Sequence, residues 1–339
     1  MDHTEQLNPE NQAYPSAGVT EQVSYPPKYS KHAEQPSNIW LKSATSLVLY
    51  LVIGYYIFKS FNMLLLITAI VVFHELGHFM AMKAFRYKDL GIFFIPLLGA
   101  YVSGTKREVS QRESAIILLA GPLPGMIIGF VLYYFYLQDP QLHLGGIPFY
   151  TISISLIFLN LVNLLPVYPL DGGQLLNRVF LDESGLVSRF FVLLSIAAMT
   201  WFALYGMGTP VYPLLIFPAM MLFRLFGDGK LNTIEKRIED AGFNLDTSYE
   251  ELPDEDYWKI RQILVTEYAP LKDLGQGSPL EFHQKEEKIV STIESLLHRN
   301  LMQDLSWAGK GLILLLWVAA LASPWLSGMD LSFFDRFGF

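Results

Sequence analysis

The sequence predicts an all-α polytopic membrane protein with about seven transmembrane helices, a short membrane-associated β segment and a small helical cytosolic segment. Three observations predict this class. Hydrophobic residues make up 52% of the 339 residues, charged residues only 17%, and the mean hydropathy is +0.31. Apolar stretches of about 20 residues, long enough for a helix to cross the hydrocarbon core, recur along the chain. Polar residues gather in the first 38 residues and in one segment before the last apolar stretch.

Composition also excludes several kinds of site. The chain has no cysteine, which excludes disulfides, thiolate metal sites and cysteine nucleophiles. The net charge of −8 gives no support to nucleic-acid binding, so no nucleic-acid partner is expected. Most of the negative charge lies between residues 228 and 310, which hold 17 Asp and Glu against 10 Lys and Arg.

The hydropathy pattern divides the chain into five parts. Residues 1–38 are polar and contain no apolar run, which predicts a disordered cytosolic tail without a secretory signal peptide. The remaining parts are a six-span membrane domain at 39–227 with its core at 61–175, an acidic helical cytosolic segment at 228–307, a C-terminal transmembrane helix at 308–329, and a tail at 330–339.

The predicted spans follow from the longest apolar stretches. The first four spans are expected at 39–58, 61–82, 114–138 and 144–170. The uncharged stretch 190–223 is too long for one helix, and the GMGTP sequence at 206–210 divides it into a fifth and a sixth span. The seventh span is expected at 311–329, after a polar segment with helical patterning at 231–241, 255–267 and 284–304.

One apolar stretch is too short to cross. Leu90–Gly104 has 15 residues, includes Pro96 and is rich in β-favouring residues. We expect an extended, hairpin-like segment that dips into the membrane beside the second span, because irregular backbone at that depth needs protein or a water-filled cavity around it.

Basic residues predict the orientation. The loop between the second and third spans holds six Lys and Arg residues, whereas the loops at 139–148 and 206–210 hold none. The positive-inside rule places the first loop in the cytosol and the other two outside. The N-terminus and the segment 231–307 are then cytosolic, and Lys59 is the one basic residue on the outer side.

The second span carries three ionisable residues among apolar neighbours: His74, Glu75 and His78. Such residues are costly at membrane depth and mark function by default. On a helix the two histidines lie one turn apart on the same face and can bind one metal ion. Glu75 can then take a proton from water at the open position of the metal, which is the H-E-x-x-H arrangement of zinc metallopeptidases.

A catalytic zinc needs a third protein ligand, and Asp171 is the candidate. It ends the fourth span after Pro166 and Pro169, where the helix must break and the carboxylate can turn back toward the metal. The alternative is an ordinary aspartate at a membrane boundary.

Two glycines of the third span, Gly121 and Gly125, reach a depth that overlaps that of the metal. A Gly-x-x-x-Gly spacing allows close approach of another helix, so simple packing is one interpretation. The other is contact with a substrate strand, because Pro122 and Pro124 disturb the helix and free backbone groups. The sequence leaves both open.

Three motifs in this order resemble the site-2 protease family of intramembrane zinc metalloproteases: HELGH at 74–78, Gly121-x-x-x-Gly125, and Asn163-x-x-Pro166 leading to Leu170-Asp171-Gly172. The resemblance covers roughly residues 61–175. It implies one Zn²⁺ per chain bound by His74, His78 and Asp171, Glu75 as general acid and base, and Asn163 as a candidate for holding substrate or the oxyanion. Many family members carry Asn where this chain has Gly125.

The expected function is hydrolysis of peptide bonds within or next to transmembrane helices of substrate proteins, in regulated intramembrane proteolysis. The partners would be a transmembrane protein substrate and the lipid bilayer, here of a bacterial cell membrane. A metal or ion transporter using the same ligands is the alternative, but transporters usually show internal repeats and ionisable residues in several spans. An inactive relative that only binds membrane partners is a second alternative, which the complete set of ligands and Glu75 disfavours.

Overall fold

The computed structural model describes residues 25–30, 38–58, 60–96, 99–106, 109–181, 186–206, 210–245, 247–268, 270–272, 280–297 and 301–329. Most of the predicted tail 1–38, the whole tail 330–339, Lys59 and the centre of the 206–210 loop lie outside these described residues.

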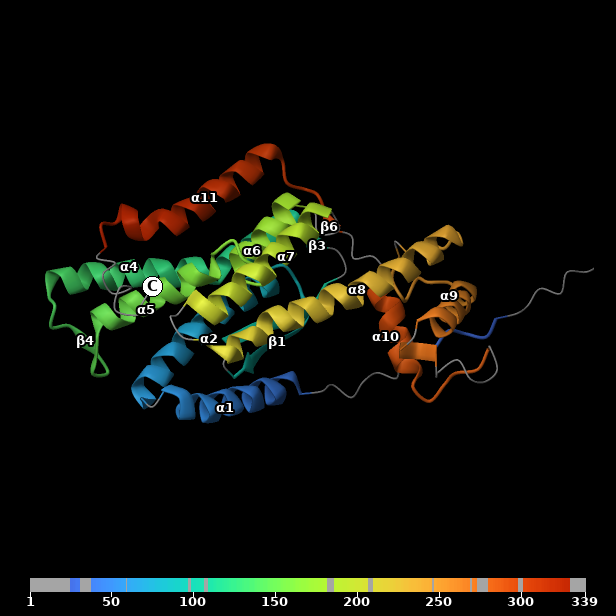
Figure 1. Ribbon diagram of the computed structural model, residues 1–339, viewed down its shortest axis with the longest axis horizontal. Coiled ribbons are helices and arrows are strands. Elements are labelled where there is room, and N and C mark those ends of the chain that lie inside the picture. The colour runs from blue at the N-terminus through green and yellow to red at the C-terminus, as the bar shows by residue number, and fades with distance from the viewer. Residues whose placement is uncertain are drawn as a thin grey trace, which may run out of the picture.

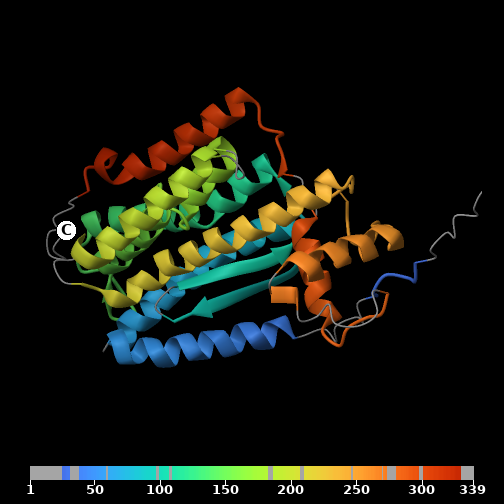
Figure 2. The ribbon, with the colours of Figure 1, turned by 45° about the vertical axis from the view of Figure 1, so that its right-hand side comes forward.

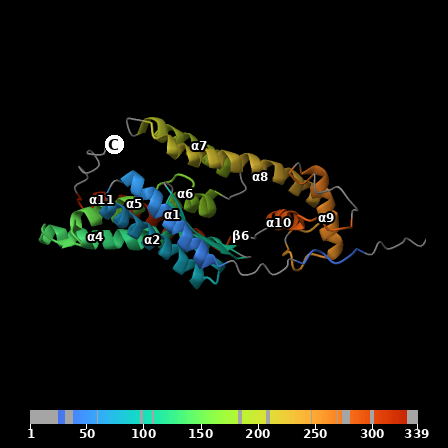
Figure 3. The same ribbon diagram turned by 90° about the horizontal axis from the view of Figure 1, so that it is seen from below.

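The helices form a long bundle with a smaller group of helices at one end (Figure 1). The bundle contains α1 (Ile39–Phe58), α2 (Phe61–Ala84), α3 (Gln111–Ala120), α4 (Pro122–Gln138), α5 (Phe149–Asn163), α6 (Asp171–Leu176), α7 (Leu186–Trp201) and α11 (Trp307–Leu326). Helix α8 (Ile216–Asp240) runs out of the bundle toward α9 (Asp254–Glu267) and α10 (Glu286–Leu296), as Figure 3 shows from below.

Among the described residues, five helical stretches are long and apolar enough to cross a membrane, which makes the chain an integral membrane protein. They are Ile39–Tyr56, Phe61–Ala84, Gln111–Gln138, Leu186–Gly206 and Trp307–Leu326. Two shorter apolar helices, Phe149–Asn163 and Tyr212–Phe223, lie where the sequence predicts the fourth and sixth spans. The predicted count of about seven is therefore not confirmed, since five stretches reach the required length.

Local sequence explains the ends of these helices. Ser60 accepts a hydrogen bond from the N–H of Met63 at the start of α2, and Ser110 does the same for Glu113 at the start of α3. Pro122 begins α4 directly after Gly121, so α3 and α4 together form one long span with a break at Gly121. Short irregular helices, η1 (Asn177–Leu181), η2 (Phe202–Gly206) and η3 (Tyr212–Leu215), extend α6 and α7 and precede α8.

The predicted hairpin-like segment is an antiparallel hairpin. Strand β1 (Lys88–Ile95) pairs with β2 (Gly99–Thr105), with Ile95 opposite Gly99 at the turn. Helix α1 packs against β1, and both strands contact α2. Figure 2 shows the two strands between α1 and the other helices. The hairpin therefore lies beside the helix that carries HELGH.

Two further strand pairs close the ends of the bundle. Strands β4 (His143–Leu144) and β5 (Ile147–Pro148) form a small hairpin between α4 and α5. Strand β3 (Val109–Ser110) pairs in parallel with β6 (Leu301–Met302), and the Ser110 hydroxyl donates a 2.6 Å hydrogen bond to the Asp304 carboxylate. This pairing places the start of α11 beside the start of α3.

The helices at the end of the bundle have a hydrophobic core of their own. We call residues 234–297 the α8–α10 module; its buried members include Ile238, Tyr257, Leu264 and Ile289. The described N-terminal residues 25–30 also pack against this core. Residues 25–30 and the module therefore lie at the same end of the bundle (Figure 1).

Candidate metal centre

Helix α2 brings His74, Glu75 and His78 into the interior of the bundle. All three side chains are buried, although the helix is otherwise apolar. The two imidazole Nε2 atoms face each other at 3.1 Å. The one-turn spacing in the sequence therefore produces two converging ring nitrogens, as expected.

Asp171 reaches the same point from the other side. It is the first residue of α6, after a turn that follows α5. Its Oδ2 atom lies 3.1 Å from Nε2 of His74 and 3.2 Å from Nε2 of His78. Within the described part of the chain, His74, His78 and Asp171 are the group of His, Asp or Glu side chains whose ligand atoms lie close enough together to hold one metal ion.

Hydrogen bonds at the far side of each ring leave Nε2 free to bind a metal. Nδ1 of His78 lies 2.7 Å from the carbonyl oxygen of Ile117, which can only accept, so Nδ1 carries the proton. In the neutral ring, Nε2 then presents a lone pair. A backbone carbonyl in this position is the usual orienting partner of a metal-binding histidine.

His74 is oriented by Asn160 in the same way. Its Nδ1 lies 2.8 Å from Oδ1 of Asn160. The amide cannot be reversed, because Nδ2 of Asn160 donates to the carbonyl of Leu156 at 2.7 Å. Nδ1 of His74 must therefore donate. The sequence interpretation missed Asn160; an asparagine within an apolar stretch, one turn before Asn163, was the available signal.

The three converging atoms fit a zinc ion. Among the described residues, no hydrogen-bond donor reaches the buried Oδ2 of Asp171, which leaves a carboxylate oxygen beside two nitrogen lone pairs. Three such atoms repel one another unless a cation lies between them. Zinc bonds of about 2.0–2.1 Å at tetrahedral angles place ligand atoms roughly 3.3 Å apart, close to the observed triangle.

Gly121 and Gly125 leave room for this arrangement. A Cβ atom at Gly121 would overlap the ring of His78, and one at Gly125 would overlap the side-chain amide of Asn160. The structure thus brings both glycines to the site, against the candidate ligand His78 and its neighbour Asn160. These contacts favour the packing interpretation over direct substrate contact.

The turn that carries Asp171 is held by distant helices. The indole of Trp317 in α11 donates to the carbonyl of Leu164 at 2.8 Å, and the backbone N–H of Tyr168 donates to the hydroxyl of Ser195 in α7 at 3.1 Å. The side chain of Gln174 closes the turn by donating to the carbonyl of Pro169 at 2.9 Å. These contacts fix the position of the carboxylate.

Two predicted site residues have different surroundings. Glu75 is buried beside the candidate ligands, and its carboxylate interacts electrostatically with His74, His78 and Asp171. Asn163 lies at the end of α5 and donates to the carbonyl of Leu159 at 3.2 Å. Asn163 is half-buried, and it is Asn160 that bonds the metal-site histidine.

Comparisons with known proteins relate the chain to metalloproteases. Residues 62–143 match the family model of peptidase family M50, which covers HELGH and both glycines but not Asp171. The chain is 33% identical over 116 residues to zinc metalloprotease MJ0392 of Methanocaldococcus jannaschii, and 30% identical over 118 residues to stage IV sporulation protein FB of Bacillus subtilis. These matches cover 34% of this chain, 33% of the first relative and 40% of the second.

One solved structure is also similar. The site-2 protease from Methanocaldococcus jannaschii is 24% identical with a TM-score of 0.39, covering 54% of this chain and 85% of that chain. In the two sequence matches, the chain spans only about a third to two fifths of the length of the curated relatives.

Proposed function

We propose that this chain, which resembles peptidase family M50 and the site-2 proteases, is an intramembrane zinc metalloprotease that hydrolyses peptide bonds within or next to transmembrane helices. The observation that carries the proposal is the triangle of Nε2 of His74, Nε2 of His78 and Oδ2 of Asp171, buried beside Glu75. The alternative of a transporter or an inactive relative is not favoured by the comparisons.

His74, His78 and Asp171 would hold one zinc ion per chain. When bound, zinc supplies Lewis acidity that activates water and polarises the scissile carbonyl. Glu75 would accept the proton from the attacking water and return it to the leaving amine. Asn160 and the carbonyl of Ile117 keep both imidazole rings turned toward the metal.

The substrate would be a transmembrane protein. Its helix must unwind locally, because the carbonyls of an intact helix are hydrogen-bonded internally. Asn163 is the candidate for holding substrate or the oxyanion; its half-buried side chain lies on the same helix as Asn160. Gly121 and Gly125 support the site mainly by admitting His78 and Asn160.

We place the enzyme in a bacterial cell membrane with its N-terminus in the cytosol. The basic loop between α2 and α3 supports this orientation through the positive-inside rule, and one curated relative comes from a bacterium.

The test separates metal binding from proton transfer. Glu75→Gln should retain zinc in the detergent-purified protein but lose cleavage of a model transmembrane substrate, because the amide cannot accept the proton. Asp171→Ala should lose both zinc and cleavage. Asp139→Ala, at the exposed end of α4, is the matched control and should change neither. Near-normal turnover by Glu75→Gln would contradict the proposed base.

A further inference from the structure

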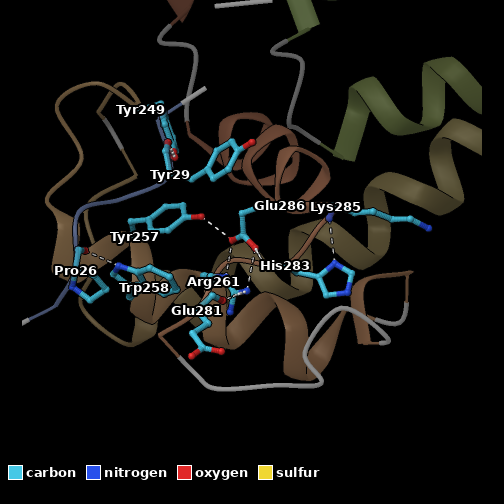
Figure 4. A network of polar contacts seen from close by, with 10 residues as sticks. All are labelled: Pro26, Tyr29, Tyr249, Tyr257, Trp258, Arg261, Glu281, His283, Lys285 and Glu286. Atoms are coloured by element: carbon cyan, nitrogen blue, oxygen red, sulfur yellow. Dashed lines mark hydrogen bonds and ion pairs between the residues drawn. The ribbon is translucent and has the colours of Figure 1, made fainter. Parts of the chain in front are cut away.

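Residues 25–30, Tyr-Pro-Pro-Lys-Tyr-Ser, lie across the α8–α10 module without regular secondary structure (Figure 4). Every hydrogen bond between the segment and the module joins residues at least 220 positions apart in the sequence. Consecutive prolines favour an extended backbone whose carbonyls are free to accept hydrogen bonds from a partner. The segment is thus presented to the module as a peptide ligand would be.

Lys28 is recognised by its charge and by its backbone. Its Nζ atom donates to the carbonyl oxygens of Glu250 at 2.8 Å and Leu252 at 2.5 Å, and lies 5.5 Å from the ring centroid of Tyr249. Its backbone N–H donates to the carboxylate of Asp254 at 2.9 Å. Two carbonyls and an aromatic face suit an ammonium group and reject a carboxylate.

Aromatic side chains of the module bind the rest of the segment. The indole N–H of Trp258 donates to the carbonyl of Pro26 at 2.7 Å, as Figure 4 shows, and the hydroxyl of Tyr249 donates to the carbonyl of Tyr29 at 2.7 Å. Phe282 packs edge-on against Tyr29 at 5.3 Å between centroids and stacks on Trp258 at 5.0 Å. Tryptophan and tyrosine donors beside proline are a recurring means of recognising proline-rich peptides.

A buried network beneath these aromatics holds them in place. Arg261 forms a 2.5 Å ion pair with Glu286, whose carboxylate also accepts from the hydroxyl of Tyr257 at 2.7 Å (Figure 4). The guanidinium of Arg261 lies 5.2 Å from the ring centroid of Trp258. Arg261 thus supports Trp258 from below, on the side away from its N–H bond to Pro26.

We propose that the surface formed by Tyr249, Glu250, Leu252, Trp258 and Phe282 is a peptide-binding site for extended segments of the pattern aromatic-Pro-Pro-Lys-aromatic. Residues 25–30 are its intramolecular ligand. The partner that fits it in trans is a tail of another membrane protein with this composition, because α8 holds the module beside the membrane helices. The site is independent of the zinc chemistry proposed above.

The intramolecular ligand predicts a competition. A segment tethered to the same chain is present at an effective concentration of the order of millimolar, so it largely excludes a free peptide from the intact protein. Lys28→Glu should release the segment, because a carboxylate cannot bond the two carbonyls. Lys28→Arg, which keeps the charge and the donors, is the conservative control.

The experiment uses the full-length protein in detergent and a fluorescent peptide of residues 23–32, VSYPPKYSKH. Cleavage by chymotrypsin after Tyr29 measures release of the segment and should be faster in Lys28→Glu than in the parent or Lys28→Arg. The peptide should bind Lys28→Glu at least about ten-fold more tightly than the parent. The same peptide with glutamate in place of Lys28 should not bind.

A second substitution locates the binding surface. Trp258→Phe, added to Lys28→Glu, keeps an aromatic ring but loses the N–H to Pro26, so peptide affinity should fall about five-fold or more. Trp325→Phe, at an exposed position on α11, should leave it unchanged. Equal cleavage after Tyr29 in the parent and Lys28→Glu overturns the intramolecular ligand. Faster cleavage without tighter peptide binding overturns the site for partners in trans.

Discussion

At the scale of single residues, the proposed metal centre depends on what bonds the far side of each imidazole. His78 uses a backbone carbonyl, which substitution of a side chain cannot remove, whereas His74 uses the side chain of Asn160. Asn160 is held in turn by the carbonyl of Leu156. The orientation of His74 is therefore the part of the site most open to mutation.

Asn160→Ala should lower zinc affinity by about 10–100-fold, because His74 loses the acceptor that fixes its proton on Nδ1. Metal content after dialysis against graded zinc buffers measures this loss. Asn163→Ala, one turn along the same helix, is the matched control: it should keep zinc affinity, and any fall in its turnover would indicate a substrate contact. Equal zinc affinity in Asn160→Ala and the parent would contradict the orienting role.

The sequence predicted the convergence of His74, His78 and Asp171, and the structure brings them together. Helical spacing determines the first two, and the prolines around 166–169 explain the turn that carries the third. Asn160 escaped prediction because an asparagine in an apolar helix has no spacing rule that pairs it with one particular histidine. Its hydrogen-bond partner depends on how α5 packs against α2, which is visible only in the tertiary structure.

At the scale of elements, the close contact between α4 and its neighbours depends on small residues. Gly121 lies at the break between α3 and α4, where the ring of His78 occupies the space of a side chain. The glycine spacing visible in the sequence indicates close approach, but it does not say what approaches. The structure shows that the neighbours are His78 and Asn160.

Gly121→Ala should therefore displace His78 and reduce zinc content. A methyl group at this position meets ring atoms that are fixed by the carbonyl of Ile117, so the ring cannot move without losing that bond. Gly311→Ala, where an added Cβ meets no atom within 4 Å, is the control and should retain zinc. Measuring the zinc content of the two purified variants tests whether Gly121→Ala displaces His78. Full zinc occupancy in Gly121→Ala would show that the ring has another position.

The α8–α10 module should be acid-sensitive. Burial raises the pKa of Glu286, but hydrogen bonds from Arg261, Tyr257 and the backbone N–H of His283 outweigh it and hold the pKa below its usual value. A lowered pKa in the folded state stabilises the module above the unfolded pKa of about 4.3, and this stability is lost as pH falls through the folded value.

Glu286→Gln should destabilise the module by about 3–5 kcal/mol at neutral pH, because it leaves Arg261 buried without its charge partner. It should also remove much of the acid dependence. Glu287→Gln, its exposed neighbour, is the control. Thermal unfolding followed by circular dichroism from neutral pH down to about pH 2 measures both effects, since the stability is lost below the unfolded pKa. An unchanged acid profile in Glu286→Gln would assign the sensitivity to other groups.

At the scale of the whole molecule, the β4–β5 hairpin and the module lie at opposite ends of the bundle (Figure 1). The sequence predicted this separation from the distribution of Lys and Arg. It could not predict the pairing of β3 with β6 or the contact of residues 25–30 with the module. Both join segments far apart in the chain, and a short proline-containing segment has no periodicity that indicates a partner.

The absence of cysteine from the sequence permits a direct test of topology. We expect an impermeant maleimide to label Gln141→Cys on intact cells and Glu287→Cys only after lysis, since both positions are exposed and lie at opposite ends. Labelling of Glu287→Cys on intact cells, with Gln141→Cys protected, would reverse the orientation. Labelling of both on intact cells would contradict the predicted arrangement of spans.

The hydrogen bond from Trp317 to the carbonyl of Leu164 has a consequence for the order of biosynthesis. The chain is made from its N-terminus, so all three proposed metal ligands emerge from the ribosome long before α11. Until α11 is made, the turn that carries Asp171 lacks the hydrogen bond from the Trp317 indole to the carbonyl of Leu164. The last described helix to be made thus completes the support of a site whose proposed ligands are all made by residue 171 of 339. A chain released early would carry every ligand but hold Asp171 less firmly, so full support of the centre requires synthesis through α11.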